Sequence, residues 1–198
     1  MPVAGSPDDS RPWLIVGLGN PGAEYARHRH NIGYGVADEL ARRVGGTFRA
    51  NKRARALTLE DRVAGQRAVL VKPTTYMNDS GQAVAPLSAF YKSGPDRIVA
   101  IHDELDLPFG SLRLKFGGGD NGHNGLKSLR RSLGTGDFFR ARFGIGRPPG
   151  RLDAAVFVLR DFSAAERVDI DIEVSRVADA VEALITEGLE RAQSQFND

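Results

Sequence analysis

The stretch VGLGNPGAEYARHRHNIG, residues 16–33, joins an apolar strand to a helix and decides how the start of the fold is interpreted. Its first half matches the G-x-G-x-x-G fingerprint of dinucleotide-binding folds, in which the glycine turn runs directly into a helix. Here Pro21 and Gly22 occupy the place of that helix start, and the helical pattern begins only near Asn31. We therefore interpret residues 20–22 as a tight turn, and we disfavour a nucleotide cofactor.

The other residues of this stretch suggest a catalytic role. Gly17 and Gly19 carry no side chain, so we expect the strand end to lie close to a bound substrate. The following loop delivers His30 just before the helix, where the positive end of the helix dipole favours the neutral imidazole, the form that acts as a base. Arg29 places a positive charge beside His30, which we expect to lower the pKa of the imidazole. A metal site at His28-x-His30 is disfavoured, because no further histidine or carboxylate completes a known spacing.

A carboxylate that could support this base lies in IHDELDLPFG, residues 101–110. Asp103 stands at the end of an apolar strand, and strand ends of open α/β sheets are where ligand sites form. A carboxylate that accepts a hydrogen bond from an imidazole fixes its tautomer and stabilises the imidazolium. Asp103 is therefore the predicted partner of a catalytic histidine.

Two asparagines, Asn78 and Asn124, stand at predicted helix starts. Asparagine is a common helix N-cap, which gives both residues a structural interpretation. Their amides could instead orient a carbonyl or stabilise an oxyanion. Spacing leaves both interpretations open.

The composition is that of an ordinary soluble globular protein. The chain has 198 residues, of which 41% are hydrophobic and 26% charged. No apolar run is long enough to span a membrane, and the N-terminus lacks the features of a secretory signal. We expect residues 1–12 to form a flexible extension and residues 13–198 a single domain. The absence of cysteine suits a reducing environment, so we predict a cytoplasmic protein.

Apolar runs alternate with helical patterns along the chain. This alternation, with apolar strands between helices, predicts an α/β fold with a mixed β-sheet flanked by helices. Residues 64–67 (AGQR) indicate a hairpin turn between two strands, and Ser163 is the predicted start of a long C-terminal helix. The strands are expected at residues 13–18, 53–63, 68–73, 97–105, 111–116, 141–146 and 154–159, and the helices at 31–44, 78–92, 124–133 and 163–188.

Charge is distributed unevenly along the chain. Residues 111–151 hold nine basic and two acidic side chains, whereas residues 160–198 hold four arginines and ten carboxylates. This asymmetry indicates one face for an anionic partner, although solvated surface charges would produce the same count. Arginine outnumbers lysine, which favours bidentate contacts to phosphate if the partner is a nucleic acid.

Four segments together resemble bacterial-type peptidyl-tRNA hydrolases, in the order in which that family carries them. They are residues 16–33, KPTTYMNDSG (72–81), HDELDLPFGSLRLKFGGGDNGHNGLKS (102–128) and FRARFGIGRPPGR (139–151). The resemblance covers the chain from Trp13 to about residue 188. The chain departs from the usual pattern at Arg29, where the family usually carries threonine or a similar residue. It also departs in the ending RAQSQFND (191–198), whose role stays open.

The resemblance implies an enzyme that cleaves the ester between a peptide, or an N-blocked amino acid, and the 3′ ribose of tRNA. It implies a monomer with a twisted mixed sheet and with neither metal nor cofactor, whose partner is the acceptor arm of peptidyl-tRNA with its nascent peptide. By motif position it makes His30 catalytic, Asp103 its support and Asn20 the residue that senses the blocked amino group. The remaining matched positions are Tyr25, Tyr76, Asn78 and Asn124 for the peptide or terminal adenosine, Met77 in the same crevice, and Lys115 and Arg142 for tRNA.

Two other functions remain as alternatives. A catalytically inactive RNA-binding protein could share this fold, but the joint presence of the residues assigned above argues against it. A dinucleotide-dependent oxidoreductase would show saturable binding of a nicotinamide cofactor.

Overall fold

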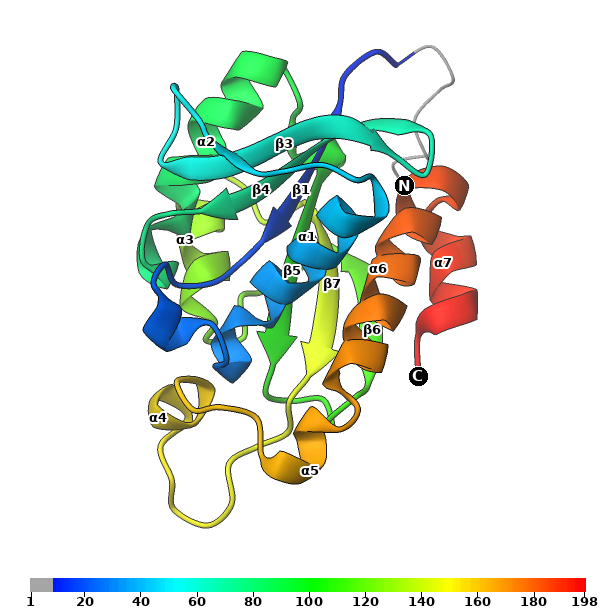
Figure 1. Ribbon diagram of the computed structural model, residues 1–198. Helices are drawn as coiled ribbons and strands as arrows, with labels where there is room; N and C mark the ends of the chain where they lie inside the picture. Colours follow the sequence, from blue (N-terminus) through cyan, green and yellow to red (C-terminus); the bar gives the residue numbers. More distant parts are fainter. Residues whose placement is uncertain (1–8) are drawn as a thin grey trace.

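The computed structural model describes residues 9–198, in which helices pack on one twisted mixed sheet (Figure 1). Seven strands of the described residues pair in the order β2-β3-β4-β1-β5-β7-β6. β1 pairs in parallel with β4 and β5, and β5 with β7, whereas β2–β3, β3–β4 and β6–β7 are antiparallel. The strands are β1 (Trp13–Gly17), β2 (Arg49–Ala50), β3 (Ala56–Val63), β4 (Gln66–Pro73), β5 (Ile98–Glu104), β6 (Leu112–Phe116) and β7 (Phe139–Gly144).

Helices cover both faces of the sheet and give a three-layer arrangement. α1, α6 and α7 lie on one face, and α2 and α3 lie on the other (Figure 1). Short α4 and α5 follow β7 and lie beyond the end of the sheet. The helices are α1 (Ile32–Arg43), α2 (Ser80–Tyr91), α3 (Asn124–Leu133), α4 (Ala154–Val158), α5 (Ala164–Arg167), α6 (Ile170–Glu187) and α7 (Leu189–Phe196), with 3-10 turns η1 (Ala23–Tyr25), η2 (Arg29–Asn31), η3 (Met77–Asp79) and η4 (Pro95–Arg97).

The central strands confirm the mixed sheet predicted from the sequence. Every residue of β1 and of β5 is buried, because helices cover both faces of these parallel strands. The predicted hairpin is formed by β3 and β4, and its turn residues Ala64 and Gly65 both have positive φ, as a type I′ turn requires.

Two glycines allow α1 to pack directly against the ends of the central strands. A Cβ on Gly33 would lie 2.5 Å from the backbone nitrogen of Leu18 and would collide with the carbonyl oxygen of Ile101. Those two groups hydrogen-bond each other at 3.1 Å, which ties the end of β1 to β5. A Cβ on Gly17 would in turn collide with the backbone of Gly33. Gly17 therefore faces a helix, and its lack of a side chain serves this contact. That the strand end lies close to a bound substrate stays a prediction.

Gly19 is explained by the same helix. A Cβ at this position would lie 2.6 Å from the ring of Tyr34, which belongs to α1. Gly17, Gly19 and Gly33 thus serve the packing of α1 at the strand end.

The strand expected at 154–159 is a helix, α4, and this prediction is wrong. The Asp153 side chain accepts a hydrogen bond from the backbone nitrogen of Ala155 at 2.8 Å and so starts a helix. β7 is already paired on both sides, with β5 and with β6, so it has no free edge for another strand. A short apolar run fits either element, and here its surroundings selected the helix.

The long helix expected from Ser163 is interrupted. Ser163 does form a capping box with Glu166, but α5 ends at Arg167 and α6 begins at Ile170. The short strand β2 and the C-terminal helix α7 were not predicted from the sequence.

The divergent ending supports the edge strand β6. The side chain of Asp198 accepts a hydrogen bond from the backbone nitrogen of Leu112 at 2.9 Å, and Asn197 accepts one from Leu114 at 2.7 Å. These contacts cover backbone groups that an edge strand would otherwise leave open.

Residues 1–8 of the expected N-terminal extension lie outside the described residues. Within the rest of it, the Asp9 carboxylate pairs with Arg11 and Arg97 at 2.6 and 2.7 Å. None of the helices in residues 9–198 is long and apolar enough to cross a membrane.

The close approach of α1 predicts that Gly33→Ala is destabilising. We expect a loss of about 2–3 kcal/mol in the free energy of unfolding, because the added methyl group must push α1 away from β1 and β5. The matched control is Gly35→Ala in the same helix, where a Cβ meets only Val174 at 3.8 Å. That change is expected to be neutral or to stabilise by up to about 1 kcal/mol. Denaturant unfolding measures both, and equal stabilities would contradict the packing argument.

Candidate active site

The candidate site lies at the carboxyl ends of the parallel strands. β4 and β5 lie on opposite sides of β1, so the strand order reverses at β1. Such a reversal leaves a crevice at the carboxyl ends, which is the usual ligand site of open α/β sheets. Asn20 follows β1, Met77 follows β4, and Asp103 lies near the end of β5.

His30 and Asp103 form a buried pair in this crevice. The Nδ1 atom of His30 lies 3.0 Å from both carboxylate oxygens of Asp103. Since a carboxylate only accepts hydrogen bonds, Nδ1 carries the proton and donates it to Asp103. The Nε2 atom has no hydrogen-bond partner among residues 9–198, so its lone pair is available when the ring is neutral. The sequence predicted this pair, and the structure places the two residues in contact.

A second histidine, His123, binds the same carboxylate and was missed as a site residue. Its Nε2 lies 2.9 Å from Oδ1 of Asp103. Its Nδ1 accepts hydrogen bonds from the backbone nitrogens of Gly125 and Leu126, which makes His123 the N-cap of α3. Because the cap uses Nδ1 as an acceptor, the proton lies on Nε2 and points at Asp103. The available signal was a histidine directly before a predicted helix start, the same position that drew attention to His30.

The pKa values follow from these contacts. Burial alone lowers the pKa of His30, but the charge and hydrogen bond of Asp103 outweigh it and raise the pKa above the usual histidine value. Burial would raise the pKa of Asp103, yet His30 and His123 hold it well below its usual range, so Asp103 is ionised. Burial and the neighbouring His123 lower the pKa of His102 far below the usual value, which keeps that ring neutral.

Arg29 does not act on His30 in the way expected from the sequence. Its guanidinium is bound by Glu166 at 2.8 Å and by the carbonyl oxygen of Asp161 at 2.8 Å. The pKa shift of His30 is set by burial and by Asp103, with no contribution from Arg29. The expected depression by Arg29, and the net depression expected from the helix start, are therefore not found.

Asn20 is held by two backbone hydrogen bonds from one neighbour. Asn31 donates from Nδ2 to the carbonyl oxygen of Asn20 at 2.9 Å and accepts from its backbone nitrogen at 3.0 Å. The side-chain Oδ1 of Asn20 accepts a hydrogen bond from the backbone nitrogen of Met77 at 2.7 Å. With Oδ1 occupied, the Nδ2 donor is the group that Asn20 can offer to a substrate.

A cavity of about 120 Å³ adjoins the two histidines. Asn124 lines it and is the first residue of α3, so the cap at this helix is His123 and not Asn124. Asn78 lies exposed in η3, and among the described residues its side chain makes no capping hydrogen bond. The N-cap interpretation therefore fails for both asparagines, which leaves their amides for other contacts.

The other predicted residues surround this centre. The rings of Tyr25 and Tyr76 meet edge to face at 6.3 Å, and Tyr76 is 60% exposed. Met77 is buried with its sulfur against Gly125, where a Cβ would lie only 2.6 Å away. Met77 thus fixes the spacing between η3 and α3, the two elements that carry the candidate asparagines.

Basic side chains gather on one face of the β6–β7 ladder. Lys115 stands opposite Arg140, and Arg113 opposite Arg142, so four cations share that face. Arg142 pairs with Glu104 at 3.2 Å, and Arg140 is turned inward to backbone carbonyl oxygens of a glycine loop. Burial and the two neighbouring arginines lower the pKa of Lys115. Facing like charges of this kind suit an anionic partner.

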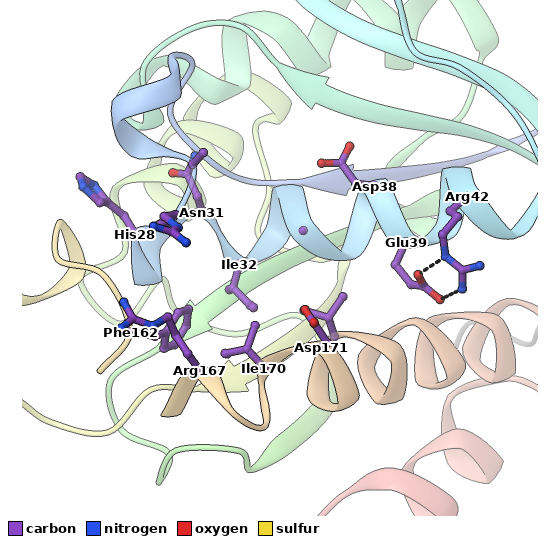
Figure 2. Close-up of a pocket in the computed structure, with 14 residues that line it drawn as sticks. His28, Asn31, Ile32, Asp38, Glu39, Arg42, Phe162, Arg167, Ile170 and Asp171 are labelled. Carbon is purple, nitrogen blue, oxygen red and sulfur yellow. Dashed lines mark hydrogen bonds and ion pairs between the residues drawn. The ribbon is translucent and has the colours of Figure 1, made fainter. Parts of the chain in front are cut away.

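A larger cavity, of about 610 Å³, lies between α1 and α6 (Figure 2). It is lined by His28 and Asn31 at one end and by the Glu39–Arg42 ion pair at the other. None of Asn20, His30 and Asp103 lines it. The smaller cavity is therefore the candidate site, because it adjoins the groups that can transfer a proton.

Among the described residues, one cluster has a geometry that could hold a metal ion. It consists of His30, Asp103 and His123. Their ligand atoms lie within 4.8 Å of one another. The distances of 2.9 and 3.0 Å between nitrogen and oxygen are those of N–H···O hydrogen bonds. A metal ion would have to replace both bridging protons.

Comparison with known proteins extends over almost the whole chain. The family model for peptidyl-tRNA hydrolase matches residues 14–198. The chain is 57% identical to a peptidyl-tRNA hydrolase of Streptomyces coelicolor, over 96% of this chain and 97% of that protein. A Mycobacterium tuberculosis peptidyl-tRNA hydrolase is 54% identical, over 95% and 98% of the two chains.

The chain belongs to the peptidyl-tRNA hydrolase family. A crystal structure of peptidyl-tRNA hydrolase from Acinetobacter baumannii superposes with a TM-score of 0.89 at 38% identity, covering 98% of this chain and 97% of that one. The α/β architecture predicted from the sequence is thus the architecture of the peptidyl-tRNA hydrolases.

The raised pKa of His30 predicts the effect of neutralising its partner. Asp103→Asn removes the charge that raises this pKa and leaves the burial that lowers it. We expect the His30 titration midpoint to fall from above the usual value of about 6.5 to below it. Histidine proton NMR at a series of pH values measures this midpoint, and a midpoint that stays above 6.5 in Asp103→Asn would contradict the assignment of the cause.

Proposed function

We propose that this chain hydrolyses the ester that joins a peptide, or an N-blocked amino acid, to the 3′ ribose of tRNA, with His30 as the general base. The observation that carries the proposal is the protonation pattern of the neutral His30 ring, with a proton on Nδ1 and a lone pair on Nε2. Its Nδ1–H is committed to Asp103, while Nε2 remains without a partner among the described residues, next to a cavity. An imidazole held in this way can take a proton from water.

The reaction would proceed in two steps. Nε2 of His30 removes a proton from water as the water oxygen forms a bond to the ester carbonyl carbon. The resulting tetrahedral oxyanion then collapses and breaks the bond between this carbon and the 3′ oxygen, and the imidazolium returns the proton to that oxygen. Asp103 stabilises the imidazolium between the two steps. Proton transfer of this kind needs no cofactor.

Asparagine amides would hold the substrate during these steps. Asn78 and Asn124 are not used as helix caps, so they can steady the carbonyl and the developing oxyanion. Asn20 offers an N–H donor, which fits the carbonyl of an N-acyl group. The ammonium of an unblocked aminoacyl-tRNA carries only donors, so it finds no acceptor on Asn20. This polarity supports recognition of the blocked amino group by Asn20.

The partner would be the acceptor arm of peptidyl-tRNA, with the nascent peptide in the crevice near Tyr25, Tyr76 and Met77. Arg113, Lys115 and Arg142 on β6 and β7 support contacts to phosphates, with Lys115 and Arg142 as the tRNA-binding residues, whereas Arg140 is buried. We also propose that the chain acts as a monomer in the cytoplasm, in keeping with the absence of cysteine.

Replacement of the proposed base tests the chemistry directly. We expect His30→Ala to lower the single-turnover rate on N-acetyl-aminoacyl-tRNA by about 10²–10⁴-fold, because general-base catalysis is lost. The control is His28→Gln, which changes a histidine two residues away that lines the other cavity. That variant is expected to stay within about threefold of the wild type. A near-native rate for His30→Ala would reject the base assignment, and a wild type without activity would favour an RNA-binding protein.

If the basic face binds tRNA phosphates, removing one of its cations should make tRNA binding less sensitive to salt. Lys115→Met removes one phosphate contact, so we expect the slope of log affinity against log salt to become smaller by about one. Arg42→Met is the matched control, because Arg42 is on α1 with a side chain 74% exposed and away from this face. Its salt slope is expected to equal that of the wild type. Equal slopes for Lys115→Met and wild type would place the RNA elsewhere.

A further inference from the structure

Arg29 is buried although it directly precedes the proposed base. Only 6% of its surface is exposed. Its side chain contacts the segment formed by residues 153–166, which contains α4 and the start of α5. The positive charge of Arg29 therefore contacts residues 153–166, although Arg29 precedes His30 in the sequence.

Arg29 holds this segment through both terminal nitrogens of its guanidinium and through its backbone. The backbone nitrogen donates to the carbonyl oxygen of Arg160 at 3.0 Å. Nη1 donates to the carbonyl oxygen of Asp161 and Nη2 to the carboxylate of Glu166, both at 2.8 Å. The guanidinium carbon lies 4.1 Å from the centre of the Phe157 ring, a cation–π contact.

Glu166 connects Arg29 to the start of α5. The carboxylate oxygen that accepts from Arg29 also accepts from the backbone nitrogen of Ser163 at 2.7 Å, as part of the capping box. The carboxylate of Glu166 thus joins η2 to the N-terminus of α5.

The segment that Arg29 holds forms a wall of the proposed active site. Ala154, Ala155 and Val158 of α4 line the cavity of His30, Asp103 and His123. Phe157, which stacks on Arg29, is the residue next to Val158. A shift of this contact would therefore move the cavity wall.

We propose that Arg29 is a positioning residue, which fixes α4 as the wall of the active site by clamping residues 157–166. This inference rests on the proposed function, because it takes the cavity of His30 as the place where substrate binds. Lysine cannot replace arginine in this role, since an ammonium lacks the planar fork that serves Asp161, Glu166 and the Phe157 ring together.

Two substitutions separate this role from an effect of charge on His30. Arg29→Lys keeps the charge and loses the fork, whereas Arg29→Gln loses both. If Arg29 positions the wall, both variants lower kcat/KM on N-acetyl-aminoacyl-tRNA by about tenfold or more, since small misplacements at a reacting centre are costly. The His30 titration midpoint in the NMR experiment stays unchanged in both. If Arg29 acts by charge, Arg29→Lys keeps the wild-type kcat/KM and Arg29→Gln raises the midpoint, and either result overturns the proposal.

Hydrogen exchange distinguishes a local role from general destabilisation. We expect faster amide exchange in residues 153–166 of Arg29→Lys, with β1 and β5 unchanged. Exchange that is unchanged in 153–166, or faster throughout the chain, overturns the proposal. Arg160→Lys is the control, because only the backbone carbonyl of Arg160 is used by Arg29, and its kcat/KM and exchange should match the wild type.

The test of the Arg29 clamp can fail without failure of the proposed function. His30→Ala is measured in the same assay. A large loss there, combined with a wild-type kcat/KM for Arg29→Lys, rejects the clamp alone and leaves the proposed function standing.

Discussion

The buried carboxylate of Asp103 is the group on which the site depends. Taking a carboxylate out of water is costly unless hydrogen bonds and opposite charge compensate for it. Here His30 and His123 supply two N–H donors at 3.0 and 2.9 Å. The carboxylate in return fixes which nitrogen of His30 carries the proton. One interaction therefore keeps Asp103 ionised and leaves Nε2 of His30 as the free basic atom.

The backbone brings these three residues together from distant parts of the chain. Gly33 lets the start of α1 rest on the hydrogen bond between Leu18 and Ile101, and His30 lies three residues before Gly33. The cap of α3 orients His123 through its Nδ1 atom. The site is thus a product of helix starts docked at the ends of β1 and β5. Side-chain chemistry alone would not bring the two histidines to one carboxylate.

The sequence predicted the parts of this arrangement that follow from local pattern. Fully apolar runs indicated the central strands, and position at a helix start singled out His30. The apolar run at 154–159 misled, because its structure depended on the Asp153 cap and on the pairing of β7 on both sides. His123 was missed because its role follows from the tautomer that the cap imposes. The direction of Arg29 was also beyond sequence reasoning, since Glu166 and Phe157 are far away in the chain.

The central claim is that loss of a proton from His30 switches on catalysis. The direct test compares the pH dependence of the single-turnover rate on N-acetyl-aminoacyl-tRNA with the NMR titration of His30 in the same protein. We expect the rate to rise with pH at the midpoint at which His30 loses its proton, and this midpoint to lie above the usual value of about 6.5. A rate that stays constant while His30 titrates would contradict it.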